Sequence, residues 1–129
     1  MQGVYRAAPM SAFDELYGLE VIAAGPEDAR GRVAVHDGVR QPAGLVHGGI
    51  YASIAESLAT MATAAAIGGD AVVRGQNSQT SFLRPITQGS VHATGRPRHR
   101  GRSTWVWEFD MTDDAGRLCA LVRMTVAIG

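Results

Sequence analysis

The sequence predicts an α+β fold in which an antiparallel sheet wraps around one long central helix. Two observations predict it: a single apolar segment of helical length, residues 47–67, and shorter strand-like runs, two before this segment and four after it. The 129 residues show no repeat, linker or low-complexity tract, so we expect one domain spanning residues 1–129.

The composition limits the partners and the compartment. Basic and acidic residues number 12 each, which argues against a nucleic-acid-binding protein that depends on a basic surface. The single cysteine, Cys119, excludes an internal disulfide, is typical of a reducing compartment and is expected in the core. The N-terminus has no apolar segment of signal-peptide length, and Glu56 makes the helical segment a poor membrane span. We therefore expect a cytoplasmic protein with no membrane partner.

Residues 1–10 are predicted to form a flexible tail. Ser11 is the expected N-cap of a short helix, which Gly18 ends. Two strands then flank a turn at residues 25–28, whose composition is typical of turns. These two strands and the loop that follows them are expected at residues 19–24, 30–36 and 39–45.

The central helix, residues 47–67, would be roughly 30 Å long, and the two glycines Gly68 and Gly69 follow its end. In the last two strand-like runs, apolar residues alternate with other residues, which is the clearest strand pattern in the chain. Residues 113–116 predict a hairpin between these two runs. The four strands after the helix are expected at residues 71–83, 90–99, 103–112 and 117–128.

The start of the central helix is a candidate binding site. His47, Gly48 and Gly49 lead into it, and the first N–H groups of a helix have no partner within the helix and carry the positive end of its dipole. Such groups can hold an anion or polarise a carbonyl oxygen. Taken alone, the same residues also fit a simple tight turn, which His47 would support.

Glu56 is the one charged residue between Ile50 and Ile67. On an apolar helix we expect it in a poorly hydrated place, where its pKa and reactivity can be tuned, although a structural carboxylate with a satisfied partner is the alternative. Thr60, one turn later, could orient this carboxylate or a water, or could bond the carbonyl four residues back. Gln41, in the preceding loop, can donate its amide to a substrate oxygen, or be an ordinary polar loop residue.

Gly48 and Glu56 are eight residues apart, which is about 12 Å along a helix. They cannot both touch one carbonyl group. If they form one site, Glu56 must come from a second copy of the chain whose helix runs antiparallel across a two-fold axis. A single shared site therefore predicts an obligate dimer with two equivalent sites.

A second polar cluster spans residues 96–102, which include four arginines, and continues through Ser103 and Thr104. It fits a solvated turn between strands, or a cradle for phosphate. Arg84 is a further phosphate candidate. The four histidines lack metal-ligand spacing, and no nucleotide-binding glycine motif or serine-hydrolase elbow is present, so no metal or cofactor is expected.

Residues 41–60, QPAGLVHGGIYASIAESLAT, resemble the active-site segment of hotdog-fold acyl-CoA thioesterases. The likeness is strongest to the Arthrobacter-type 4-hydroxybenzoyl-CoA thioesterase and extends over residues 16–128. It continues through the segments at residues 75–85, 103–107 and 113–120. The fold that this resemblance implies, a long helix wrapped by an antiparallel sheet, agrees with the fold predicted from the residue pattern.

The resemblance implies a role for each candidate residue. Glu56 would be the catalytic carboxylate, acting as nucleophile or as general base, and the Gly48 N–H would be the oxyanion donor. Gln41 would lie near the thioester, and Thr60 would position water or the carboxylate. Coenzyme A would be contacted by Arg84, Arg102, Ser103 and Thr104. The family forms dimers of dimers with each site between two chains, so the resemblance implies a homotetramer.

One departure from the family concerns a basic C-terminal tail, which this sequence lacks after Gly129. Arg100 and Arg102 are the residues expected to compensate. The expected function is hydrolysis of an aromatic acyl-CoA, 4-hydroxybenzoyl-CoA being the leading example. The alternatives are a hydroxynaphthoyl-CoA or medium-chain acyl-CoA substrate, or a non-catalytic acyl-CoA-binding module, which would not need Glu56 and Thr60.

Overall fold

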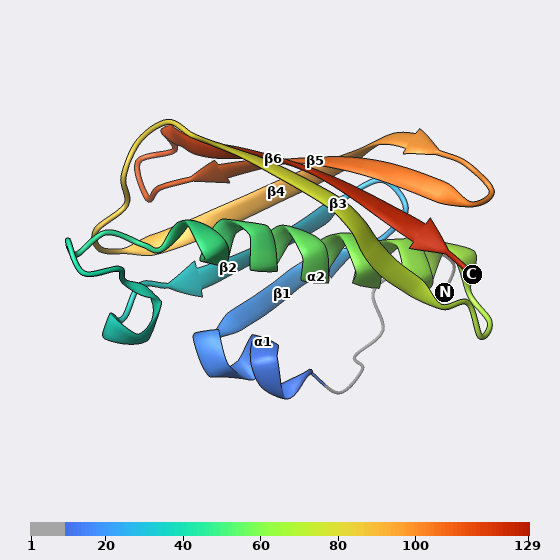
Figure 1. Cartoon of the computed structure of the whole chain (residues 1–129), viewed down its shortest axis with the longest axis horizontal. Helices are drawn as coiled ribbons and strands as arrows, with labels where there is room; N and C mark the ends of the chain where they lie inside the picture. The colour runs from blue at the N-terminus through green and yellow to red at the C-terminus, as the bar shows by residue number, and fades with distance from the viewer. Residues whose placement is uncertain (1–9) are drawn as a thin grey trace.

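A computed structural model describes residues 10–129 of the chain. The predicted flexible tail, residues 1–10, lies almost entirely outside this range. One antiparallel sheet of six strands curves around a long helix, α2 (Gly48–Ile67), which confirms the predicted α+β architecture (Figure 1). Across the sheet the strands follow the order β1 (Leu19–Ala24), β2 (Ala29–Ala34), β4 (Ser90–Arg100), β5 (Thr104–Thr112), β6 (Leu118–Ile128) and β3 (Val73–Phe82).

The short helix α1 (Ala12–Tyr17) begins as predicted, because the Ser11 hydroxyl accepts the Asp14 N–H at 3.0 Å. The Asp14 side chain is buried and accepts hydrogen bonds from the hydroxyls of Ser11, Tyr17 and Ser57 at 2.9, 2.8 and 2.6 Å. Ser57 belongs to α2, so this carboxylate fastens the short helix to the central one. The sequence indicated only the capping part of this arrangement.

Strand β2 ends at Ala34, two residues before its predicted end. His36 instead begins a short 3-10 helix, η1 (Asp37–Val39), and its Nδ1 accepts the Gly38 N–H at 3.1 Å. The predicted strand boundary is wrong because the histidine side chain offers the backbone an alternative partner to the sheet.

The core lies between α2 and the concave face of the sheet. Every second residue of β5 is buried, beginning with Trp105, which confirms the alternation predicted from sequence. Helix α2 has the length and composition of a membrane span, but the sheet covers one of its faces. The fully buried positions on that face are Ile54, Ala55, Leu58, Ala59, Ala62 and Thr63.

Among the residues that the structure describes, strand β3 is an edge of the sheet and pairs with β6 alone. Nearly all of its residues are exposed, and its sequence is mostly polar. It runs back along α2, so that its last residue, Phe82, lies at the helix N-terminus. The helix face beside this strand is left partly open in the single chain.

Three loops lie at the N-terminal end of α2: the loop before this helix, the loop after β3 and the turn between β5 and β6 (Figure 1). The loop before the helix is joined to the loop after β3 by the Val46 N–H, which donates to the Ile86 carbonyl at 2.8 Å. The loop after β3 is joined to β6, because the N–H groups of Leu83 and Arg84 donate to the Cys119 carbonyl at 2.9 and 3.0 Å. These bonds fix the surroundings of the helix start.

Candidate active site

The first turn of α2 presents an unused donor. His47 is the N-cap residue, and its Nδ1 accepts the Gly49 N–H at 2.9 Å, the supporting role that its sequence position suggested. Within residues 10–129, the Gly48 N–H has no hydrogen-bond acceptor. A free N–H at the positive end of a twenty-residue helix can stabilise a developing negative charge on oxygen.

A cavity of about 460 Å³ opens beside this donor. It brings together three residues that the sequence singled out, Gln41, Gly48 and Arg84. The Gln41 side-chain oxygen accepts the Ala43 N–H, which leaves the amide NH₂ as the donor for a ligand. The remaining walls are mainly apolar and were not predicted; they are formed by Leu45, Val46, Tyr51, Phe82, Leu83, Pro85 and Cys119.

Tyr51 and Cys119 both line this cavity, and burial makes each side chain harder to ionise. Burial raises the pKa of Tyr51 to about 12, so its phenol stays neutral. Burial, reinforced by the charge of Asp113, also raises the pKa of the Cys119 thiol. The walls contain no carboxylate. A carboxylate that acts as base or nucleophile at this cavity must therefore come from outside it.

Glu56 lies two turns further along α2 and is exposed. Its carboxylate rests against β3 at Gly75, where a Cβ atom would be 3.0 Å from Cδ and from Oε2. The prediction of a poorly hydrated carboxylate is wrong for the single chain, because the Glu56 side chain is exposed beside the edge strand β3. The eight-residue separation also keeps Glu56 about 12 Å from the Gly48 cavity of its own chain.

Thr60 does not touch the Glu56 carboxylate through a hydrogen bond in this chain. Its hydroxyl is within bonding distance of two backbone carbonyls, those of Glu56 at 2.9 Å and Ser57 at 3.1 Å. The bond to the Glu56 carbonyl, four residues back, is the alternative role that the sequence suggests for Thr60.

The other proposed coenzyme-binding residues lie at the far end of the sheet (Figure 1). Thr104 of β5 pairs with Ala127 of β6. Ala127 in turn pairs with Arg74, near the start of β3. The cavity end of β3 is at Phe82, roughly 26 Å away along the strand. The backbone carbonyl of Ser103 accepts the Ile128 N–H at 2.9 Å, which fixes Ser103 at the same far end. One chain therefore does not place Arg102, Ser103 and Thr104 at its own Gly48 cavity.

The arginines of residues 96–102 differ in their contacts. Arg100 pairs with Glu27 at 3.0 Å and lies over the Trp105 ring, 6.0 Å from its centroid. Arg96 and Arg98 both approach Glu108, at 3.7 and 3.6 Å. In the described part of the chain, Arg102 has no carboxylate within ion-pair distance. It is therefore the arginine of this segment that is most available to a phosphate.

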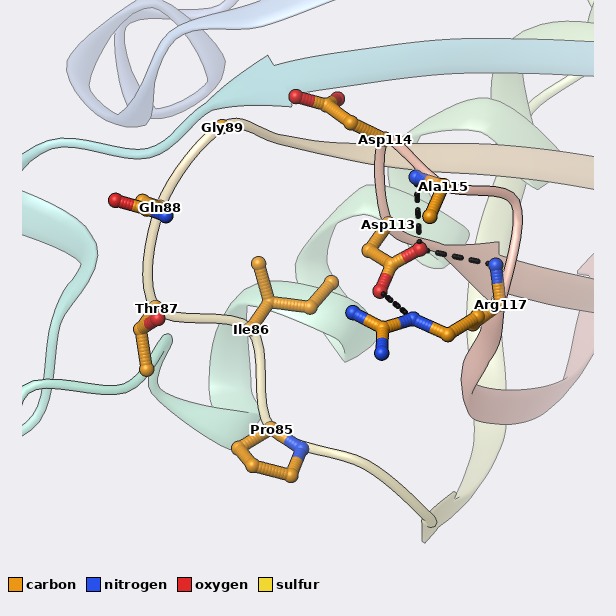
Figure 2. Close-up of a pocket in the computed structure, with 9 residues that line it drawn as sticks. All are labelled: Pro85, Ile86, Thr87, Gln88, Gly89, Asp113, Asp114, Ala115 and Arg117. Atoms are coloured by element: carbon orange, nitrogen blue, oxygen red, sulfur yellow. Dashed lines mark hydrogen bonds and ion pairs between the residues drawn. The ribbon is translucent and has the colours of Figure 1, made fainter.

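A neighbouring cavity of about 460 Å³ lies between residues 85–89 and the β5–β6 turn (Figure 2). One Asp113 oxygen accepts the backbone N–H groups of Ala115 and Arg117 at 3.0 and 2.9 Å, and the other accepts the Arg117 Nε–H at 2.8 Å. The Arg117 backbone bond is the main cause of the lowered pKa of Asp113. These groups satisfy one another and shape the predicted hairpin. Among residues 10–129, no cluster of three or more His, Cys, Asp or Glu residues could hold a metal ion.

Comparisons with known proteins agree on one family. Residues 43–120 match the thioesterase superfamily. A 1,4-dihydroxy-2-naphthoyl-CoA hydrolase of Listeria monocytogenes is 33% identical over 114 residues, covering 88% of this chain and 93% of that protein. The proofreading thioesterase EntH of Cronobacter turicensis is 31% identical over 122 residues, covering 95% and 89%. The crystal structure of a Haemophilus influenzae thioesterase superposes with a TM-score of 0.85 at 27% identity, covering 91% of this chain and 82% of that one.

Proposed function

We propose that this chain, a member of the thioesterase superfamily with its hotdog fold, acts on an aromatic acyl-CoA in a site shared by two chains. Its family and its relatives make it an acyl-CoA thioester hydrolase. The observation that carries this proposal is the cavity at the start of α2. It offers the unbonded Gly48 N–H and apolar walls, but no carboxylate.

In this proposal the thioester carbonyl oxygen lies at the Gly48 N–H, and the Gln41 amide lies beside the thioester. Attack on the carbonyl carbon places negative charge on that oxygen. The N–H and the helix dipole are already aligned with it and need no reorganisation. An uncharged thioester can then be activated without a metal.

The carboxylate comes from a second copy of the chain. Gly75, which touches Glu56, and Phe82, which touches Gly48, lie near opposite ends of β3. The outer edge of β3 has no partner strand within residues 10–129, and edge strands readily pair with another chain. Antiparallel pairing of two β3 strands, with Phe82 of one chain opposite Gly75 of the other, brings Glu56 of one chain beside Gly48 of its neighbour. The two-fold symmetry creates two such sites.

Two routes are open to this carboxylate. As a nucleophile, Glu56 attacks the carbonyl carbon, coenzyme A leaves as the thiolate and takes up a proton, and water cleaves the resulting anhydride. As a general base, Glu56 removes a proton from the water that attacks the same carbon, and the tetrahedral intermediate again expels the thiolate. Both routes yield the free acid and coenzyme A. Thr60 of the same chain would hold the attacking water near the carboxylate.

The same pairing gives the distant polar residues a role. It brings the far end of the second chain's sheet to the cavity of the first. Arg84 of one chain and Arg102, Ser103 and Thr104 of the other then contact the phosphates of one coenzyme A. We further propose that two such dimers form a homotetramer, and that the protein is cytoplasmic, in keeping with its single buried cysteine.

The proposed acyl group is aromatic. Two aromatic side chains, Tyr51 and Phe82, line the cavity, and the Listeria relative hydrolyses a naphthoyl-CoA by its name. The substrate resembles 4-hydroxybenzoyl-CoA, and 1,4-dihydroxy-2-naphthoyl-CoA is the second candidate. A medium-chain acyl-CoA is the remaining alternative substrate.

The test is release of free thiol from a panel of acyl-CoAs by wild type and by Glu56→Ala. We expect wild type to hydrolyse aromatic acyl-CoAs, and Glu56→Ala to lose at least about 100-fold in kcat with its dimer and melting temperature preserved. Glu20→Ala, which removes another exposed carboxylate, is the matched control. Binding without turnover by wild type, or full activity of Glu56→Ala, would contradict the proposal.

A further inference from the structure

Phe82 is a large aromatic residue that the chain keeps at its surface, against the first residue of the central helix. Its side chain is 63% exposed, yet its Cε1 and Cζ atoms lie 2.7 Å from the position that a Cβ on Gly48 would take. Cβ atoms do not approach ring carbons so closely, so a larger residue at position 48 would force the Phe82 ring to shift from this place. The ring therefore contacts the residue whose N–H is proposed to bind the carbonyl oxygen.

A second ring fixes one side of this arrangement. Tyr51, one turn along α2 from Gly48, is 4% exposed and is held by the core. The centroids of Tyr51 and Phe82 are 6.1 Å apart and their planes are tilted by 52°. Both residues line the cavity at the helix start. The cavity thus has an aromatic corner made of one fixed ring and one exposed ring, next to the free Gly48 donor.

We infer that Phe82 is a specificity-determining residue of this site and selects flat aromatic acyl groups. The inference rests on the proposed function. When the carbonyl oxygen lies at the Gly48 N–H, the acyl group attached to the same carbon extends into the corner that Phe82 and Tyr51 form. An aryl group meets the Phe82 ring in stacked or edge-on geometry, which adds to the gain from burying area.

An aliphatic acyl chain of similar size gains the buried area alone and loses rotational freedom on binding. Phe82 carries no proton and no charge, so it distinguishes substrates through binding and not through proton transfer. Its effect is therefore expected in KM more than in kcat.

The test compares kcat/KM for benzoyl-CoA and hexanoyl-CoA in wild type and Phe82→Leu. Leucine keeps an apolar side chain but removes the ring, and we expect the aromatic-to-aliphatic preference to fall roughly 3- to 10-fold. Phe82→Tyr retains the ring and should retain the preference. Leu121→Ala alters another exposed apolar residue, 41% exposed and outside the cavity, and should leave the preference unchanged.

The outcomes separate the two hypotheses. If wild type hydrolyses neither substrate, the proposed function fails. If wild type is active but Phe82→Leu keeps the wild-type preference, or Phe82→Tyr loses it equally, the assignment of Phe82 is overturned while the thioesterase stands. A double-variant cycle gives an independent measurement. The loss of kcat/KM caused by Gly48→Ala should be at least about 3-fold smaller in the Phe82→Leu background than in wild type, because Phe82→Leu removes the ring with which the new methyl group clashes. Equal losses in both backgrounds would count against the inference.

Discussion

The indole Nε1 of Trp107 donates a 2.9 Å hydrogen bond to the hydroxyl of Thr63. Trp107 stands in the middle of β5, Thr63 stands on α2, and both side chains are fully buried. The bond ties the concave face of the sheet to the helix inside an otherwise apolar core, and it satisfies a donor that has no access to water.

Thr63→Val should therefore destabilise the fold although it conserves shape and volume. The variant leaves the Trp107 N–H buried without an acceptor, a cost of about 1–3 kcal/mol. Urea unfolding followed by tryptophan fluorescence measures the loss. Thr125→Val, which alters a half-buried threonine on β6, should change stability by less than about 0.5 kcal/mol. Equal effects of the two variants would remove the special importance of this bond.

Gly48→Pro should abolish most of the activity while keeping the helix start. Proline is well accepted at the first helical position, and the N–H that it removes is unbonded within the described chain. Loss of one oxyanion donor costs roughly 100- to 1,000-fold in kcat. Gly48→Ala adds a comparable clash with Phe82 but keeps the N–H, so it should lose much less. Equal kcat values for the two variants would show that the N–H is not the donor.

Two inactive variants should restore activity when their chains are mixed. In a dimer of Glu56→Ala with Gly48→Pro, one of the two sites combines an intact Gly48 with an intact Glu56. Random pairing of equal amounts predicts recovery of about one quarter of the wild-type activity, since half of the dimers are mixed and each holds one good site. The mixture is refolded together and assayed for thiol release. Activity no higher than the sum of the separate variants would place both residues in one chain's site or in none.

Arg102→Gln should weaken binding of the nucleotide part of the substrate. Loss of one guanidinium–phosphate contact is expected to raise KM for an acyl-CoA roughly 10-fold with little change in kcat. The corresponding acyl-pantetheine has no nucleotide, so its KM should not change. Arg32→Gln removes an arginine that pairs with Glu20 elsewhere on the sheet and serves as control. An equal rise for both substrates would argue against a phosphate contact.

Asp113→Asn should lower stability near neutral pH but not in acid. Hydrogen bonds from Arg117 and Ala115 lower the pKa of the Asp113 carboxyl in the folded chain. Its contribution is therefore complete above the unfolded pKa of about 4 and is lost as the pH falls through the lower folded value. The gap in urea midpoint between wild type and variant should be largest at about pH 7 and close towards about pH 3. Asp70→Asn, on the loop after α2, is the control variant.

The sequence correctly predicted the helices and strands whose apolar residues recur at a regular spacing. It failed for residues whose burial depends on segments that are far away in the sequence. The alternation around Trp107 and the long apolar run before Gly68 are local patterns, so β5 and the end of α2 lie where they were expected. The exposure of Glu56 follows from which strand forms the sheet edge, and that is decided by pairing between remote segments. Periodicity does not report this pairing.

The candidate site shows the same division. The role of His47 as a cap followed from its position before two glycines. The placement of Phe82 on Gly48 could not be predicted, because it depends on the register of β3 against β6. For the same reason, the sequence could not show that Thr104 lies at the opposite end of the sheet from the helix start.

The open edge of β3 also bears on how the newly made chain behaves. An unpaired strand is ordinarily a template for aggregation, but this one carries mainly amide and hydroxyl side chains, which leave little apolar surface for an unrelated chain to bury against. Water can satisfy the outward-facing backbone donors and acceptors of such an edge strand. The polar edge of β3 therefore lowers the risk of pairing with an unrelated chain, and the proposed pairing of two β3 strands would cover this edge.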